Sequence, residues 1–185
     1  MKTLSRQLRA MGGPALLLGA ALAAVPAQAD VSLPSVLGSH MVLQRGQDCP
    51  VWGWASPDEA VTVKFSGQTH SIKADASGNW MVRLRPMKAN SKPQTLTIRG
   101  KNTLTLDDVL VGEVWLCSGQ SNMEWSVSNS DNPQQEIAAG NHPRIRHIKI
   151  PHRPSTFPEK NVPSDGWTVA SPATVGNYTA VGYFF

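Results

Sequence analysis

Cysteine is scarce in this sequence: the 185 residues contain only Cys49 and Cys117, so at most one disulfide can form. Each cysteine lies beside an apolar, strand-like stretch, where a free thiol packs as a small hydrophobic side chain. An oxidising compartment would permit a bond between them. We expect two free, buried thiols.

Clustered metal ligands and a large excess of positive charge are also lacking. The five histidines (His40, His70, His142, His147 and His152) have no spacing typical of a zinc site. The formal net charge is +4, but three positive residues and no acidic ones lie within residues 1–29, which leaves +1 on the rest. So small a net charge does not indicate the strongly basic surface that is typical of nucleic-acid-binding proteins. We therefore expect no nucleic-acid partner.

A hydrophobic run long enough to cross a bilayer is absent from the N-terminal region. The run PALLLGAALAAV (Pro14–Val25) is too short for a membrane span, which argues against the alternative of an uncleaved anchor. Basic residues precede the run, and the small-residue motif AQA (27–29) follows it, before Asp30. This pattern predicts a secretory signal peptide over residues 1–29 and a periplasmic or secreted protein without membrane attachment after cleavage.

From Val31 to about Leu106 the sequence reads as all-β. Apolar and polar residues alternate in PVWGWA, AVTVKFSG, HSIKAD, NWMVRL and QTLTIRG. Turn-forming residues separate these stretches, for example Ser66-Gly67 and Ser77-Gly78. Short strands with this spacing predict a small β-sandwich domain over residues 30–106.

The pattern changes at residue 107. Val109–Leu116 is almost continuously apolar, which is typical of a strand buried on both faces, and we expect Val109–Cys117 to be the central strand of a separate α/β layer. Asn132 and Pro133 predict a helix start, Gly140 a helix end, and RIRHIKI (144–150) another strand. The chain stops on aromatic residues inside an apparent helix, so we expect residues 107–185 to be the first part of a longer domain.

A small polar turn, SGQSN, follows the apolar run. A serine at the carboxyl end of a buried strand can present its hydroxyl to a ligand, with its own N–H facing the same point. That arrangement suits a nucleophile, although Gly119-Gln120-Ser121-Asn122-Met123 lacks the second glycine of the α/β-hydrolase motif. The alternative is an ordinary turn in which Ser and Asn bond the local backbone.

Several blocks in one order resemble the N-terminal half of the sialate O-acetylesterase family of SGNH hydrolases. They are GSHMVLQRG, PVWGWASPDEAVTVKFSG, ADASGNWMVRLRPMKA, LDDVLVGEVWLCSGQSNMEW and GWTVASPATVGNYTAVGYFF. The resemblance implies an α+β multidomain chain, in which a β-sandwich precedes a flavodoxin-like α/β/α hydrolase domain. That domain is incomplete here.

The resemblance also implies functional residues. Ser121 would be the nucleophile and its N–H an oxyanion donor, and Gly176, in VGN (175–177), is the candidate for a second donor. The family's Asn donor and its Asp-x-x-His motif have no match in this sequence, so we expect the 185-residue chain to be inactive alone.

The implied function is removal of O-acetyl groups from sugars, in particular 9-O-acetylated sialic acids, through an acetyl-enzyme and without a cofactor. An acetyl-xylan esterase on the same scaffold is an alternative. So is a non-catalytic carbohydrate-binding module, in which Trp52 and Trp54, on one face of a strand, form an aromatic platform. Tryptophan is more often a core residue, and we expect core positions for these two.

Export generates the first testable prediction. The mature protein should begin at Asp30, because the AQA motif directly precedes this residue. Intact-mass measurement of protein recovered from the periplasm or medium tests this expectation. A mass that retains Met1 to Ala29 would contradict it.

Overall fold

The structure, a computed structural model, describes residues 30–185, so the signal peptide expected over residues 1–29 lies outside the described residues. Most of the regular structure is β. The strands of the N-terminal part are β1 (Val42–Gln44), β2 (Cys49–Trp54), β3 (Ala60–Phe65), β4 (Gln68–Lys73), β5 (Asn79–Leu84), β6 (Asn90–Arg99) and β7 (Thr103–Gly112). The all-β character expected from Val31 to about Leu106 is confirmed.

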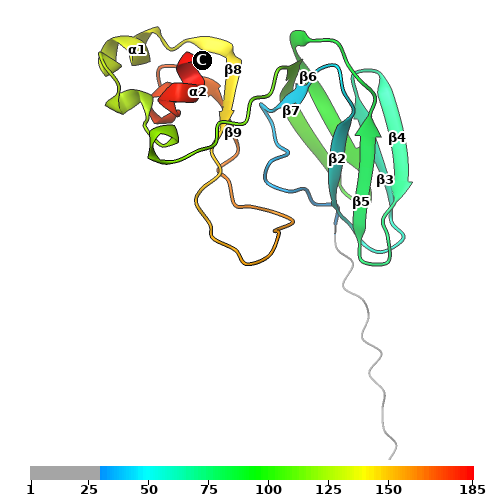
Figure 1. Cartoon of the computed structure of the whole chain (residues 1–185). Helices are drawn as coiled ribbons and strands as arrows, with labels where there is room; N and C mark the ends of the chain where they lie inside the picture. Colours follow the sequence, from blue (N-terminus) through cyan, green and yellow to red (C-terminus); the bar gives the residue numbers. More distant parts are fainter. Residues whose placement is uncertain (1–29) are drawn as a thin grey trace, which may run out of the picture.

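These strands form two sheets (Figure 1). The two sheets share one hydrophobic core. One sheet has the order β1-β7-β6-β3-β4, and the other consists of β2 and β5. Only the β1–β7 pair in them is parallel. Val51 and Val82 from the small sheet and Val63, Leu96 and Ile98 from the large one face the core, because alternate residues of a strand point to the same side. We call residues 30–112 the two-sheet unit.

The turn between β3 and β4 shows how local sequence sets the strand register. Ser66 and Gly67 both have positive φ angles, 47° and 73°. Two-residue hairpin loops with positive φ at both positions match the right-handed twist of the flanking strands. The turn pairs Phe65 with Gln68 and so aligns the alternating β3 with β4.

The C-terminal part contains two antiparallel strands, β8 (His142–Ile148) and β9 (Trp167–Ala170), and short helices (Figure 1). The helices are α1 (Pro133–Ala139), α2 (Ala180–Phe184) and the 3₁₀ turns η1 (Ser121–Met123), η2 (Val127–Asn129) and η3 (Val175–Asn177). A second small core joins them and consists of Val127, Ala170, Val175, Tyr178 and Ala180. The predicted helix from Pro133 to the residue before Gly140 is confirmed.

The expectation that Val109–Cys117 forms the central strand of a separate α/β layer is wrong. Residues 109–112 belong to β7, whose partners are β6 and β1, so they complete the large sheet of the two-sheet unit. β7 therefore runs across the boundary expected after residue 106. Residues 113–117 have no strand partner, and β8 pairs antiparallel with β9 instead of joining a parallel layer. A flavodoxin-like α/β/α domain stays a prediction.

Charged and polar contacts connect the C-terminal part to the two-sheet unit. Asp108 receives two hydrogen bonds from Arg146 of β8, at 2.5 and 3.0 Å, and lies 2.7 Å from Nδ1 of His40. The indole N–H of Trp167 donates to the Val36 carbonyl at 2.9 Å. Within residues 30–185, no helix has the length and apolar character needed to cross a membrane.

The Asp108 contacts generate a stability prediction. Hydrogen bonds from Arg146, more than any other interaction, hold the pKa of Asp108 below its ordinary value. The stabilisation is therefore present above about pH 4 and is lost as the pH falls through the lower folded-state pKa. Asp108→Asn should lower the free energy of unfolding at neutral pH by about 1–3 kcal/mol, because the Arg146 side chain, 4% exposed, loses its charged partner.

Denaturant unfolding between pH 3 and pH 7 measures this effect. The matched control is Asp107→Asn, because Asp107 is exposed and, within residues 30–185, its carboxylate accepts a hydrogen bond from the Thr95 hydroxyl alone. If both variants show the same stability and the same pH dependence, the assigned role of Asp108 is wrong.

Candidate active site

The chain leaves the large sheet at Gly112 and reaches Ser121 through a segment without regular structure. Side chains at the end of β1 hold the start of this segment. The Gln44 side-chain nitrogen Nε2 donates to Glu113 at 2.8 Å, and its side-chain oxygen Oε1 accepts the Val114 N–H at 2.7 Å. The end of β1, which pairs with β7, therefore fixes the point at which the chain leaves the large sheet.

Ser121 begins the 3₁₀ turn η1. The Gln120 carbonyl accepts the Met123 N–H at 2.9 Å, and the Ser121 carbonyl accepts the Glu124 N–H at 3.0 Å. Within residues 30–185, the Ser121 hydroxyl and the N–H groups of Ser121 and Asn122 have no hydrogen-bond partner. Ser121 is exposed, so its hydroxyl and a backbone donor are both available to a ligand.

Contacts with α2 hold the residues on both sides of this turn. Trp125 accepts the Ala180 N–H at 2.8 Å, downstream of Ser121. Upstream, a Cβ atom on Gly182 would lie 2.7 Å from Cys117 Sγ, so the cysteine side chain packs directly against that glycine. The Trp115 ring meets the Phe185 ring edge-on, with centroids 5.0 Å apart. The serine turn is therefore supported by residues about 60 positions later in the chain.

Gly176 lies in η3, in different surroundings. Its carbonyl accepts the Ser128 hydroxyl at 2.8 Å. A Cβ atom at this position would lie 2.7 Å from Ser128 Oγ and 3.3 Å from Ile137 Cδ1. Within residues 30–185, no recorded contact joins Gly176 to Ser121. Its role as a second oxyanion donor stays a prediction.

No histidine among the described residues contacts Ser121. His40 bonds Asp108, and His70 bonds Gln68 at 3.2 Å. The rings of His142 and His147 face those of Tyr183 and Tyr178, at 6.2 and 4.3 Å. Burial lowers the pKa of His147 and favours its neutral form. A nucleophilic serine needs a base within hydrogen-bonding reach, and none stands there in residues 30–185.

His152 is the histidine that comes nearest to the serine turn by contact. Its Nε2 lies 3.2 Å from Oε1 of Glu124, three residues after Ser121, and both side chains are largely exposed. Sequence reasoning missed this pair, because His152 belongs to the proline-rich loop 149–166 and no local pattern indicates where such a loop folds back. An exposed ion pair contributes little to stability, so the contact mainly locates the loop near the turn.

Within residues 30–185, no group of three or more His, Cys, Asp or Glu side chains could hold a metal ion. The groups that the turn offers are a hydroxyl and backbone N–H donors, which suit nucleophilic attack on an ester carbonyl.

Comparison with known proteins supports the family resemblance. The chain is 38% identical over 115 residues to the sialate O-acetylesterase of Mus musculus and 39% identical over 116 residues to that of Homo sapiens. Each match covers 56% of this chain. The solved structure of a carbohydrate acetylesterase from Xanthomonas citri is 43% identical, with a TM-score of 0.81 over 83% of this chain. No protein-family model matches the chain.

The chain corresponds to only part of these relatives. The matches span 21% of the mouse protein and 22% of the human protein. The structural match covers 36% of the Xanthomonas enzyme. The chain is thus similar to a limited part of larger acetylesterases.

The cysteines differ from expectation in one respect. Both are free, but only Cys49 is buried, and Cys117 is exposed, because residues 113–117 leave the sheet instead of forming a central strand. Burial raises the pKa of the Cys49 thiol, so this thiol is also chemically less reactive.

Thiol titration tests this difference. The native protein should react with one equivalent of a thiol reagent, at Cys117, and the denatured protein with two. Cys117→Ser should remove the native reaction, and Cys49→Ser should leave it. If neither the native nor the denatured protein reacts before reduction, the cysteines form a disulfide and the assignment of free thiols is wrong.

Proposed function

We propose that this chain is the nucleophile-bearing part of a serine esterase that removes O-acetyl groups from sugars, in particular 9-O-acetylated sialic acids. One observation carries the proposal. Ser121, the residue that the family resemblance implies as nucleophile, is exposed at the start of η1, with its hydroxyl and backbone N–H unbonded within residues 30–185. The names of the similar proteins, sialate O-acetylesterase and carbohydrate acetylesterase, support an acetylated sugar as substrate.

The chemistry follows from the groups at the turn. The Ser121 oxygen attacks the acetyl carbonyl carbon while a base takes the hydroxyl proton. The negative charge that develops on the carbonyl oxygen is stabilised by the Ser121 N–H. The carbon–oxygen bond to the sugar then breaks, the sugar oxygen receives the proton, and an acetyl-enzyme remains. Water attacks this ester with help from the same base, which releases acetate and restores the serine.

The base and further oxyanion donors would come from chain beyond the described part. Two observations support this: no histidine contacts Ser121 within residues 30–185, and the matches span at most 36% of the similar proteins. In this proposal the two-sheet unit is a β-sandwich domain that precedes an SGNH hydrolase domain, and residues 113–185 are the start of that second domain. An N-terminal signal peptide directs the protein to the periplasm or the medium.

The names of the similar proteins narrow the choice of sugar substrate. The mammalian proteins are named for sialate, and this name supports 9-O-acetylated sialic acid as the first choice. The Xanthomonas enzyme is described more broadly as a carbohydrate acetylesterase, which keeps acetyl-xylan as an alternative. Hydrolysis rates on 9-O-acetylated sialic acid and acetylated xylan separate the two. A purely carbohydrate-binding role without catalysis would leave both substrates intact.

A chimera tests the catalytic role of Ser121. Residues 30–185 would replace the matching part of the Xanthomonas citri enzyme, to which this chain is 43% identical. The chimera should hydrolyse acetyl esters. Ser121→Ala in the chimera should lower turnover by a factor on the order of 10⁶ and leave its melting temperature almost unchanged, because the lost hydroxyl forms the bond to the acetyl carbon but makes no contact within the chain.

Two comparisons make the result decisive. Ser118→Ala, at the neighbouring serine of the same turn, should retain most of the activity of the chimera. The 185-residue chain alone should show far less activity than the chimera. An active Ser121→Ala chimera would refute the nucleophile assignment, and full activity of the chain alone would mean that one of its own histidines is the base.

A further inference from the structure

A pair of tryptophans lies on the outer face of the small sheet. In β2, Val51 and Gly53 point to the core, so Trp52 and Trp54 point outward and are half-buried. The expectation that these two tryptophans are core residues is therefore wrong. Across the pair, Trp52 is directly opposite Met81 and Trp54 is directly opposite Asn79 in β5. The four side chains form a continuous block on one face.

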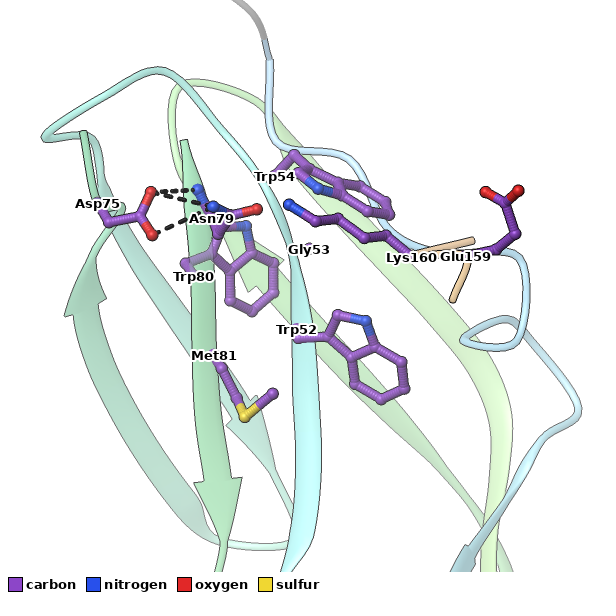
Figure 2. A pocket seen from close by; sticks show the side chains of 9 residues that line it. All are labelled: Trp52, Gly53, Trp54, Asp75, Asn79, Trp80, Met81, Glu159 and Lys160. Atoms are coloured by element: carbon purple, nitrogen blue, oxygen red, sulfur yellow. Dashed lines mark hydrogen bonds between the residues drawn. The ribbon is translucent and has the colours of Figure 1, made fainter. Parts of the chain in front are cut away.

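This block is the floor of a groove of about 580 Å³ (Figure 2). Glu159 and Lys160 also line the groove, and both belong to the loop 149–166 of the C-terminal part. Figure 2 shows the Lys160 side chain extending over the same face as Trp54. A segment about 100 residues away in sequence thus turns a flat sheet face into a recess with an apolar floor and polar edges.

The polar groups at one end of the groove are held in place. Asp75 accepts the Asn79 backbone N–H at 2.8 Å, and its two carboxylate oxygens lie 3.2 and 3.1 Å from the Asn79 side-chain nitrogen (Figure 2). The Asn79 amide is thereby oriented before any ligand arrives. Trp80, between Asn79 and Met81, points to the opposite side of the sheet and is a core residue, so its indole adds no polar group to the groove.

These features fit a sugar ring. A pyranose has apolar C–H faces, which pack on an aromatic ring, and hydroxyl groups around its edge, which need fixed donors and acceptors. Two outward tryptophans in one strand are separated by about 7 Å along it, a spacing that lets one ring or two adjoining rings lie across both. A lipid or an apolar peptide would cover the charged groups of Asp75, Glu159 and Lys160 without adding hydrogen bonds to them.

The charge of the groove selects among sugars. Its lining has two carboxylates, Asp75 and Glu159, against one ammonium group, Lys160. A ligand carboxylate would meet net repulsion, whereas neutral hydroxyl groups can donate to the carboxylates and accept from Lys160. We propose that this groove binds uncharged sugar units of a glycan.

The groove and the serine turn border the same loop. Loop 149–166 contacts Glu124, close to Ser121, through His152 and lines the groove through Glu159 and Lys160. A glycan seated in the groove would therefore lie along the loop that also contacts Glu124, three residues after Ser121, and the groove would hold the substrate by sugar units that carry no reacting group. This role in substrate binding rests on the proposed function, whereas sugar binding itself does not.

Titration with defined oligosaccharides tests the proposal. The 185-residue chain with Ser121→Ala, which removes turnover, would be titrated with xylohexaose and cellohexaose by calorimetry, with 3′-sialyllactose as the anionic comparison. The uncharged hexasaccharides should bind in the millimolar range or tighter. Trp52→Ala and Trp54→Ala should each weaken binding by about tenfold or more, and Trp52→Phe should recover most of the affinity because it keeps an aromatic face.

The matched control is Trp115→Ala, because Trp115 is also exposed, at 66%, but lies in the segment before Ser121 and outside the groove lining. This variant should bind like the parent protein. Melting curves check that each variant is folded. If a Trp→Ala variant unfolds, Lys160→Ala replaces it, since this residue lies in a loop and its loss should weaken binding severalfold.

The possible results are separable. No binding of either hexasaccharide, unchanged affinity in both groove tryptophan variants, or equal loss in Trp115→Ala would overturn the proposal. Preference for sialyllactose would overturn the charge argument and with it the choice of uncharged units. An inactive chimera together with groove-dependent sugar binding would refute the esterase function and leave the sugar site standing. An active chimera with no sugar binding would do the reverse.

Discussion

The relative placement of the two parts depends on the carboxylate of Asp108. This residue lies in β7 with a positive φ angle of 55° and is bonded to His40 on one side and to Arg146 of β8 on the other. The Arg146 side chain is almost fully buried, and a buried guanidinium without a carboxylate partner is strongly unfavourable. The contact therefore fixes where β8 lies against the end of β7. It also determines where loop 149–166 starts and, through it, the position of His152, Glu159 and Lys160.

The two-sheet unit could be predicted because its signals are local. Alternation within β2, β3 and β5, and turn residues such as Ser66-Gly67, appear within a few positions of the structure that they specify. The partner of the apolar run after residue 108 could not be predicted in this way. Val109, Leu110 and Val111 are buried as the run indicates, but their partner β1 lies more than 60 residues earlier. A buried run specifies that a strand is covered and does not specify which sheet covers it.

The candidate site likewise has one part that local sequence indicates and another part that depends on contacts between distant segments. Ser121 could be singled out as a candidate because a polar, glycine-containing turn after an apolar run is visible in consecutive residues, and the family resemblance of these residues implies its role. Its surroundings could not be found: the contacts of Trp125 with Ala180, of Cys117 with Gly182 and of Glu124 with His152 all join distant segments. The outward tryptophans were assigned to the core for a related reason. Alternation identifies two faces of a strand, but only the packed structure identifies which face is inside.

Two features of the segment around Ser121 are related. The side chains of Val114, Trp115 and Leu116 are 43%, 66% and 92% exposed, although the segment is strongly apolar. Contiguous exposed apolar side chains usually mark a surface that packs against another part of a protein. The adjoining serine lacks a base among the described residues. In the proposed function, one layer of chain that packs against residues 114–116 would cover these apolar side chains and would also supply the base that Ser121 lacks. The apolar exposure and the incomplete catalytic chemistry are then two aspects of the same uncovered edge.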